Sequence, residues 1–275
     1  MPLINVGEEN TGDIDLYYED HGSGKPVVLI HGWPLDGSSW EKQVSVLLSA
    51  GYRVITYDRR GFGKSSKPAF GYEYDTLSKD LNKLIKKLDL REAVLVGFSM
   101  GNGEVAHYLG TYGSERITKA VFIAPILPYL KKTTDNPDGV ESSIFDDIQE
   151  KIVTDRPAFL TAFFTNFYNF ESLQGKRVSD EVFRLSWNIA AGASPIGTLA
   201  CVNAWLTDFR QDLSHINIPS LIIHGDADRI LPFSATGQRL PGYLKMSRLS
   251  VIEGGPHGIL WTHSDKVNKE LVAFI

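Results

Sequence analysis

The sequence has a single cysteine, Cys201, among its 275 residues. One cysteine excludes an internal disulfide and fits a reducing compartment. Long apolar runs are also absent: the longest, AVFIAPIL at 120–127, is far short of the roughly 20 residues that a membrane-spanning helix needs. The opening segment MPLINVGEEN lacks the basic and long apolar regions of a signal peptide. We therefore expect a soluble, cytoplasmic protein without a membrane partner.

Basic charge is scarce as well. The 28 Lys and Arg residues are outnumbered by 33 Asp and Glu residues, which gives a formal net charge of −5. Nucleic-acid binding needs a clustered basic surface, and the basic pair Lys131 and Lys132 is better explained as part of a solvated loop. Hydrophobic residues make up 43% of the chain, which is ample for a sizeable core. We expect a folded protein with no nucleic-acid partner.

Short apolar runs rich in β-branched residues recur, and each ends in glycine, proline or a polar turn. They lie at 27–30, 52–57, 93–98, 117–124, 220–225 and 248–253. Near-continuous apolar strands are typical of a parallel sheet that is buried on both faces. Segments of helical period lie between the first of these runs, at 39–50, 75–90 and 100–113. The alternation predicts an α/β fold, with a mostly parallel central sheet, helices on both faces and antiparallel strands at its start.

The alternation stops between about Pro125 and Pro219, where no clear strand is found. This stretch holds the aromatic-rich segment FLTAFFTNFYNF, followed by two segments of helical period. An insertion of this kind most simply forms a helical cap over the carboxyl ends of the strands, where ligands bind in open α/β sheets. We predict a core of residues 1–125 and 216–275 and a cap of residues 126–215. Four aromatic residues of the cap either line the substrate entrance or pack the cap's own core: Phe163, Phe164, Phe167 and Tyr168.

The stretch AVLVGFSMGNGEVA at 93–106 satisfies two patterns at once. Residues 97–101 fit the nucleophile elbow G-x-S-x-G, with Ser99 as the nucleophile, and residues 101–106 fit the dinucleotide fingerprint G-x-G-x-x-G/A. A nucleotide site also needs a carboxylate at the end of the next strand, to hold the ribose. That strand ends in Ala124 instead. The stretch is therefore interpreted as an elbow, and no nucleotide cofactor is expected.

An elbow serine needs a general base and an orienting carboxylate, which follow it in the order Asp or Glu, then His. The segments HGDADRILP and EGGPHGILW each follow a strand and so reach the same sheet edge as Ser99. His257, on the turn after the last strand, is the candidate base. Asp228 lies deeper in its loop than Asp226 and is the candidate orienting acid, whereas Asp226 is better placed to brace the turn. A metal site that includes His224 is disfavoured, because alternate residues at a strand end point in opposite directions.

Two backbone N–H donors must face the charge that develops on the substrate oxygen. The amide of Met100 follows the nucleophile at a helix N-terminus, whose dipole favours an anion. The loop HGWPLDGSSW supplies the second donor, and Trp33 is the candidate because Pro34 has no N–H. The Trp33 indole is compatible with a place in the pocket wall. Because Pro34 restricts the Trp33 backbone, we also hypothesise that the Trp33 carbonyl positions hydrogen peroxide.

With the elbow, HGWP, YDRRGFGKSS, HGDADRILP and GGPHG in this order, the chain resembles the α/β-hydrolases over essentially its whole length. Within that fold it is similar to the cofactor-free bacterial haloperoxidases, also called perhydrolases, and to their relatives the aryl esterases and γ-lactamases. The resemblance implies a triad of Ser99, Asp228 and His257. It also implies an oxyanion hole formed by Trp33 and Met100.

The activity implied by the resemblance is acyl transfer. Water cleaves an acyl-Ser99 intermediate in ester hydrolysis, whereas hydrogen peroxide cleaves it to a peracid that oxidises bromide or chloride without a metal, haem or other cofactor. The expected partners are small carboxylic acids or esters, hydrogen peroxide and halide, and relatives commonly form homo-oligomers. One departure from the family is Asn102, which replaces a glycine and is expected to act at most indirectly.

Two other functions stay open, and one is nearer to acyl transfer than the other. The nearest alternative is an esterase or γ-lactamase whose peroxide chemistry is incidental. A non-catalytic, ligand-binding relative is a remote alternative. A dehalogenase or an epoxide hydrolase would need aspartate where this chain has Ser99.

Overall fold

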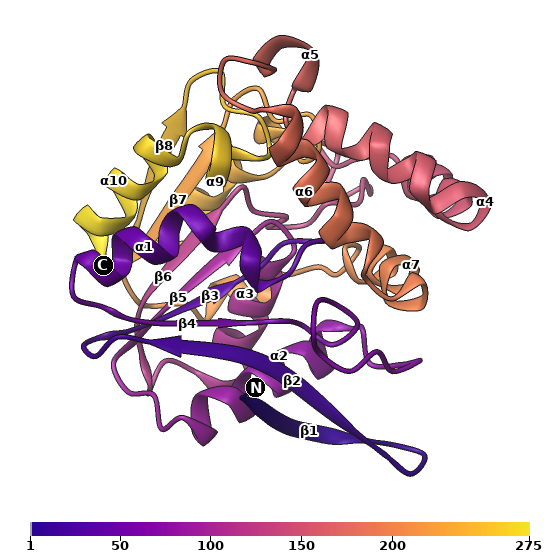
Figure 1. Ribbon diagram of the computed structural model, residues 1–275. Coiled ribbons are helices and arrows are strands. Elements are labelled where there is room, and N and C mark those ends of the chain that lie inside the picture. The colour runs from indigo at the N-terminus through magenta and orange to yellow at the C-terminus, as the bar shows by residue number, and fades with distance from the viewer. Residues whose placement is uncertain (1) are drawn as a thin grey trace.

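The central element of the structure is one mixed sheet. The computed structural model describes residues 2–275. Within that range, eight strands pair in the order β1-β2-β4-β3-β5-β6-β7-β8 (Figure 1). The strands are β1 (Leu3–Glu9), β2 (Gly12–His21), β3 (Pro26–Ile30), β4 (Arg53–Tyr57), β5 (Ala93–Phe98), β6 (Ile117–Ile123), β7 (Ser220–Gly225) and β8 (Ser247–Ile252). β2 runs antiparallel to β1 and β4, and all other neighbours are parallel, which confirms the predicted sheet.

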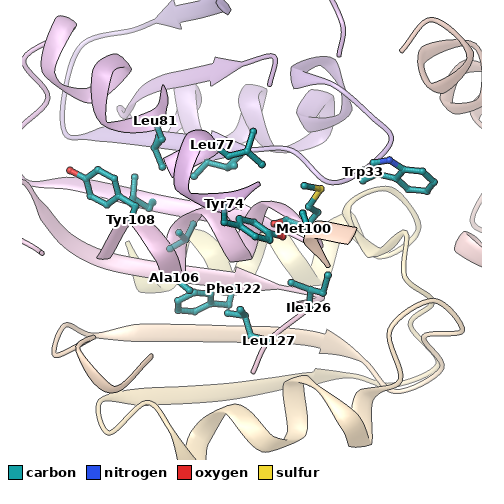
Figure 2. Close-up of a cluster of buried hydrophobic side chains, with 14 of the residues drawn as sticks. Trp33, Tyr74, Leu77, Leu81, Met100, Ala106, Tyr108, Phe122, Ile126 and Leu127 are labelled. Carbon is teal, nitrogen blue, oxygen red and sulfur yellow. Dashed lines mark hydrogen bonds between the residues drawn. The ribbon is translucent and has the colours of Figure 1, made fainter. Parts of the chain in front are cut away.

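The parallel strands are apolar along their length because both faces of the sheet are covered. In β3, Val28 and Ile30 join the hydrophobic core on one face, whereas Val27 and Leu29 join the core on the other. This division follows from the two-residue period of a strand. Figure 2 shows part of the first core, where side chains from α2 and α3 meet β6.

Helices cover the two faces in pairs (Figure 1). α1 (Glu41–Ser49) and α10 (Ser264–Phe274) pack together on one face, and α2 (Tyr74–Lys87) and α3 (Gly101–Tyr112) pack together on the other. The helical periods in the sequence predict α1, α2 and α3, but α10 was not predicted. The single-turn α9 (Ile259–Thr262) and the 3-10 helices η1 (Gly37–Trp40), η2 (Phe233–Ala235) and η3 (Gly237–Gly242) complete the core.

A helical segment follows β6 at the carboxyl ends of the strands (Figure 1). It contains α4 (Ser142–Phe167), α5 (Phe170–Leu173), α6 (Asp180–Ala191) and α7 (Pro195–Ala204). The next helix, α8 (Arg210–Ser214), packs against α3. The division into a core and a cap at 126–215 stays a prediction. No helix in the described part of the chain combines the length and apolar character needed to cross a membrane.

The long helix α4 is bent near its middle. Asp155 has non-helical backbone angles, φ −155° and ψ 82°. Pro157 lacks an N–H and its ring crowds the preceding turn, so a regular helix cannot continue through it. The Asp155 carboxylate accepts a hydrogen bond from the Ala158 amide at 3.0 Å, as an N-cap does. The second half of α4 is therefore a separate helical segment with its own N-cap, Asp155.

His107 of α3 joins three helices. Its Nδ1 lies 2.9 Å from Asp212 Oδ2 of α8, and its Nε2 lies 2.7 Å from Asp75 Oδ1 of α2. The hydrogen bond to Asp212 raises the pKa of His107, and partial burial opposes that rise. Because this pKa is higher in the folded state than in the unfolded state, the protonated imidazole stabilises the fold. The contribution is complete below the ordinary histidine pKa of about 6.5 and is lost as the pH rises through the folded-state value.

We therefore expect His107→Gln to lower the free energy of unfolding by about 1 kcal/mol at pH 6 and by clearly less at pH 9. Urea unfolding of the wild type and the variant at both pH values measures this difference. The matched control is His21→Gln, because His21 is exposed and contacts Glu19 at 3.4 Å. An equal loss for His107→Gln at both pH values would contradict the prediction.

Candidate active site

Ser99 lies on the sharp turn between β5 and α3. Its φ of 53° falls in the left-handed region, which is uncommon for a residue other than glycine and concentrates at functional sites. The flanking glycines are required by close packing. A Cβ on Gly97 would lie 2.8 Å from Asn102 Cα, and a Cβ on Gly101 would lie 2.8 Å from His31 O. The turn is therefore the strained elbow that the pattern G-x-S-x-G predicts.

The structure brings Ser99, His257 and Asp228 into one hydrogen-bonded chain. Ser99 Oγ lies 2.9 Å from His257 Nε2, and His257 Nδ1 lies 2.7 Å from Asp228 Oδ2. A carboxylate accepts only, so His257 carries its proton on Nδ1 and turns the lone pair of Nε2 toward Ser99. All three side chains are buried. The arrangement suits proton transfer from the serine to the histidine.

Asp228 is held as a carboxylate by its surroundings. Burial by itself raises the pKa of Asp228, but the electrostatic interaction with His257 and the hydrogen bonds from His224 and His257 outweigh it and keep this pKa well below its ordinary value. The second oxygen, Oδ1, accepts hydrogen bonds from the amides of Ile230 at 2.8 Å and Leu231 at 2.9 Å. Four donors therefore fix both the charge and the orientation of this side chain.

One of those donors, His224, was not predicted as a partner of Asp228. Its Nε2 lies 3.0 Å from Asp228 Oδ2, the same oxygen that His257 contacts. The sequence signal is a histidine at the end of the buried strand β7, four residues before the aspartate. Asp226, in contrast, is exposed and accepts a hydrogen bond from the Gly254 amide at 2.7 Å, which agrees with its predicted role as a brace of the turn.

The predicted oxyanion donors lie beside the serine. Met100 precedes the first residue of α3, so its amide lies at the positive end of the helix. Within residues 2–275, neither the Met100 amide nor the Trp33 amide donates a hydrogen bond to another residue. Both are therefore available to a ligand oxygen. The Trp33–Pro34 peptide bond is cis.

A cavity of about 250 Å³ is lined by Ser99 and by side chains of α4. Apart from Ser99, its buried lining residues are apolar: Trp33, Met100, Ile126, Leu130, Phe145, Trp205 and Leu231. The Trp33 indole is part of this wall, and its Nε1 donates to Thr198 O at 3.1 Å. The charged and amide side chains of the lining are exposed and mark the mouth: Asp147, Lys151, Asn166 and Arg229. The site accommodates an uncharged, apolar group next to the serine.

The four aromatic residues singled out in the predicted cap have different environments. Phe163 lines the cavity. Phe164 of α4 is fully buried and packs against Phe183 of α6. Phe167 stacks edge-on against His257, with ring centroids 5.1 Å apart, and the Tyr168 hydroxyl lies 2.7 Å from Ser186 Oγ.

Asn102 stabilises the elbow. Its Nδ2 donates to Ser99 O at 2.9 Å and to Ile123 O at 2.8 Å, and the side chain is fully buried. It thus ties the nucleophile turn to the end of β6. The contact is with the backbone of Ser99 and not with the reacting hydroxyl, which agrees with the expected indirect effect.

Comparison with known proteins assigns the family. Residues 25–264 match the family model described as the alpha/beta hydrolase fold. The chain is 62% identical to a putative non-heme chloroperoxidase of Synechocystis sp., over the whole of both chains. It is 35% identical to a bifunctional esterase/perhydrolase of Acinetobacter calcoaceticus, covering 98% of this chain and 99% of the relative. The crystal structure of a bromoperoxidase from Bacillus anthracis superposes with a TM-score of 0.95 at 49% identity, covering 99% of this chain and 98% of the other. The chain therefore belongs to the alpha/beta hydrolase fold family and, within it, to the group of non-heme haloperoxidases and perhydrolases.

Proposed function

We propose that this protein is a serine-dependent acyl-transfer enzyme with haloperoxidase, or perhydrolase, and esterase activity. The observation that carries the proposal is the hydrogen-bonded triad of Ser99, His257 and Asp228, next to the two amides that donate to no other residue in the described part of the protein. The names of its relatives, which include chloroperoxidases and an esterase/perhydrolase, support the same chemistry. The homo-oligomer implied by the resemblance stays a prediction.

The acylation half-reaction uses the geometry directly. Ser99 Oγ attacks the substrate carbonyl while its proton passes to His257 Nε2, and Asp228 stabilises the imidazolium. The amides of Trp33 and Met100 bind the oxyanion, and each donor contributes about 3–4 kcal/mol to lowering the barrier. The intermediate collapses, the C–O bond to the leaving group breaks, and His257 returns the proton to that oxygen.

Deacylation repeats the same steps with a different nucleophile. Water gives the carboxylic acid. Hydrogen peroxide gives the peracid, and its proton also passes through His257. The peracid then transfers its terminal oxygen to bromide or chloride, which yields hypohalous acid and regenerates the carboxylic acid. Hydrogen peroxide is the oxidant, and the halide is oxidised by two electrons.

A panel of assays on the wild type tests the proposal. The substrates are an aryl acetate, a γ-lactam, and acetate with hydrogen peroxide and bromide. We expect turnover of the aryl acetate and peroxide-dependent bromination. Hydrolysis of ester or lactam without bromination favours the alternative function, which is also suggested by the 33% identical esterase of Exiguobacterium antarcticum, whose structure superposes with a TM-score of 0.90. Turnover of none of the substrates would contradict both functions.

The apolar cavity predicts a preference for acyl groups larger than acetyl. Burial of each CH₂ contributes about 0.8 kcal/mol, so kcat/KM for p-nitrophenyl esters should rise about fourfold per CH₂ until the cavity is full. Ala162 lines the cavity on α4, and Ala162→Trp should end this rise at a shorter chain. Val153→Trp is the control on the same helix, because Val153 is 71% exposed and lies outside the cavity lining. A flat chain-length series in the wild type would contradict the prediction.

Pro34 is proposed to favour peroxide over water. It follows the oxyanion donor Trp33 directly, and the Trp33 carbonyl is proposed to accept a hydrogen bond from peroxide near the acyl carbon. Pro34→Leu should lower the ratio of perhydrolysis to hydrolysis several-fold while ester hydrolysis continues. The measurement is the peracid-to-acid product ratio at a fixed peroxide concentration. An unchanged ratio would refute the proposed role of Pro34.

A further inference from the structure

A buried ion pair lies behind the proposed oxyanion hole, and no step of acyl transfer uses it. Arg59 follows β4, Glu104 lies in α3, and their exposed fractions are 1% and 0%. Arg59 Nε donates to Glu104 Oε1 at 2.5 Å, and the guanidinium Nη2 contacts the same oxygen. Tyr57 donates its hydroxyl to Glu104 Oε2 at 2.5 Å. Both oxygens of the carboxylate are therefore engaged.

Arg59 also holds the loop that carries Trp33. Its Nη2 donates to His31 O at 2.7 Å, and its backbone N–H donates to His31 Nε2 at 2.9 Å. Because Nε2 accepts, His31 must carry its proton on Nδ1, which donates to Gly32 O at 2.9 Å. Burial and the nearby Arg59 charge hold the pKa of His31 well below its ordinary value, so the ring stays neutral. Arg59 therefore holds this loop through both the backbone carbonyl and the imidazole ring of His31.

Glu104 belongs to α3, the helix whose N-terminal end carries the other proposed donor, Met100. It lies four residues after Met100, one turn along the same helix. The loop and the elbow touch directly: a Cβ on Gly32 would lie 3.0 Å from Ser99 Cβ. Tyr74 of α2 lies beside Met100 (Figure 2) and donates to Met100 O at 3.0 Å. The chain from His31 O through Arg59 to Glu104 thus connects the segments that carry the two oxyanion donors.

Stability is a poor explanation for this pair. Removing two charges from water costs several kcal/mol per ion, and well-packed apolar replacements of buried ion pairs are often neutral or stabilising. An apolar pair would fill the same volume but would give His31 O no directional donor. We infer that Arg59 and Glu104 are positioning residues, which set the Trp33 amide relative to the Met100 amide for the oxyanion. The inference rests on the proposed acyl-transfer function.

The test uses the double variant Arg59→Met with Glu104→Met, which leaves no buried charge unpaired. A misplaced donor should lower kcat for ester hydrolysis by about 10²-fold and change KM little. The second readout is the ratio of kcat/KM for an ester and for its thionoester. Sulfur is a weak acceptor, so a well-placed pair of amides favours the oxygen ester. The variant should lower this ratio about tenfold. Unlike kcat, the ratio does not depend on the folded fraction.

The neighbouring residue supplies a matched control. Arg60 and Asp80 form a second buried, bidentate ion pair, with Nε–Oδ2 2.7 Å and Nη2–Oδ1 2.9 Å. This pair joins the loop that follows β4 to α2, and within residues 2–275 Arg60 makes no hydrogen bond to His31. Arg60→Met with Asp80→Leu should keep the wild-type ester-to-thionoester ratio. Arg59→Lys, which keeps the charge but not the fork of donors, should give an intermediate ratio.

Two results would overturn the inference. One is a folded Arg59/Glu104 double variant with the wild-type ratio. The other is an equal fall of the ratio in the Arg60/Asp80 control, which would indicate general loosening of the core. An inactive wild type would instead refute the proposed function and leave no ratio to compare.

Discussion

Replacing Ser99 with alanine is expected to lower kcat for ester hydrolysis by about 10⁶-fold. The hydroxyl lies 2.9 Å from His257 Nε2 and is the group proposed to form the covalent intermediate. Without it, no acyl-enzyme forms, and only the slow direct attack of water on the bound ester remains. Peroxide-dependent bromination should fall by the same factor, because both activities pass through one intermediate. Steady-state assays of the two reactions on the same preparation measure both factors.

Two further measurements separate loss of the nucleophile from loss of the fold. An organophosphonate should label the wild type stoichiometrically and Ser99→Ala not at all. Ser99→Gly also removes the nucleophile, but it relieves the left-handed backbone at φ 53°. We expect its free energy of unfolding to exceed that of the alanine variant by about 1 kcal/mol. Bromination that survives in Ser99→Ala would contradict the shared intermediate, and an unlabelled wild type would favour the non-catalytic alternative.

Replacing Asp228 with asparagine is expected to lower kcat by about 10⁴-fold although the shape hardly changes. The oxygen Oδ1 accepts from the amides of Ile230 and Leu231, which cannot reverse their polarity. The asparagine must therefore place its carbonyl there and turn its NH₂ toward the two histidines. His257 then accepts at Nδ1, carries its proton on Nε2, and cannot take the proton of Ser99.

Activity and stability of Asp228→Asn check this account together. The wild type gains stability from Asp228 above the ordinary aspartate pKa of about 3.9 and loses it as the pH falls, because the folded-state pKa lies below that value. The asparagine variant should show a weaker fall in the free energy of unfolding between pH 5 and pH 3. Asp228→Glu, which keeps the charge, should retain more activity than Asp228→Asn. A kcat of Asp228→Asn within tenfold of the wild type would refute the proposed role.

The parts of the site that were predictable are set by local chemistry. The elbow is recognisable because its glycines must flank Ser99 in a fixed pattern. Asp228 and His257 are recognisable because strands of a parallel sheet end at one edge, so loops far apart in sequence meet there. Trp33 is recognisable because Pro34 cannot donate. In each case one constraint on the backbone leaves only one or two residues as candidates for the catalytic role.

The parts that were not predictable depend on packing between distant segments. Arg59 and Glu104 are 45 residues apart, and nothing in the period of α3 distinguishes a buried glutamate that pairs with arginine from an exposed one. His224 lies in β7 and contacts Asp228 only because the loop that carries Asp228 folds back on this strand. Helical period places Phe163 and Phe164 on different faces of α4, but only the packing of this helix decides that Phe163 lines the cavity while Phe164 packs against Phe183.

Ester hydrolysis and peracid formation are proposed to share a single acyl-Ser99 intermediate, which partitions between water and hydrogen peroxide. The most direct test supplies esters of one acyl group with several leaving groups, at a fixed peroxide concentration, and measures the peracid-to-acid product ratio. A common intermediate predicts one ratio for all the esters, even where their rates of turnover differ widely. A ratio that varies with the leaving group would show that peroxide and water attack the ester directly, and would exclude a shared acyl-Ser99 intermediate.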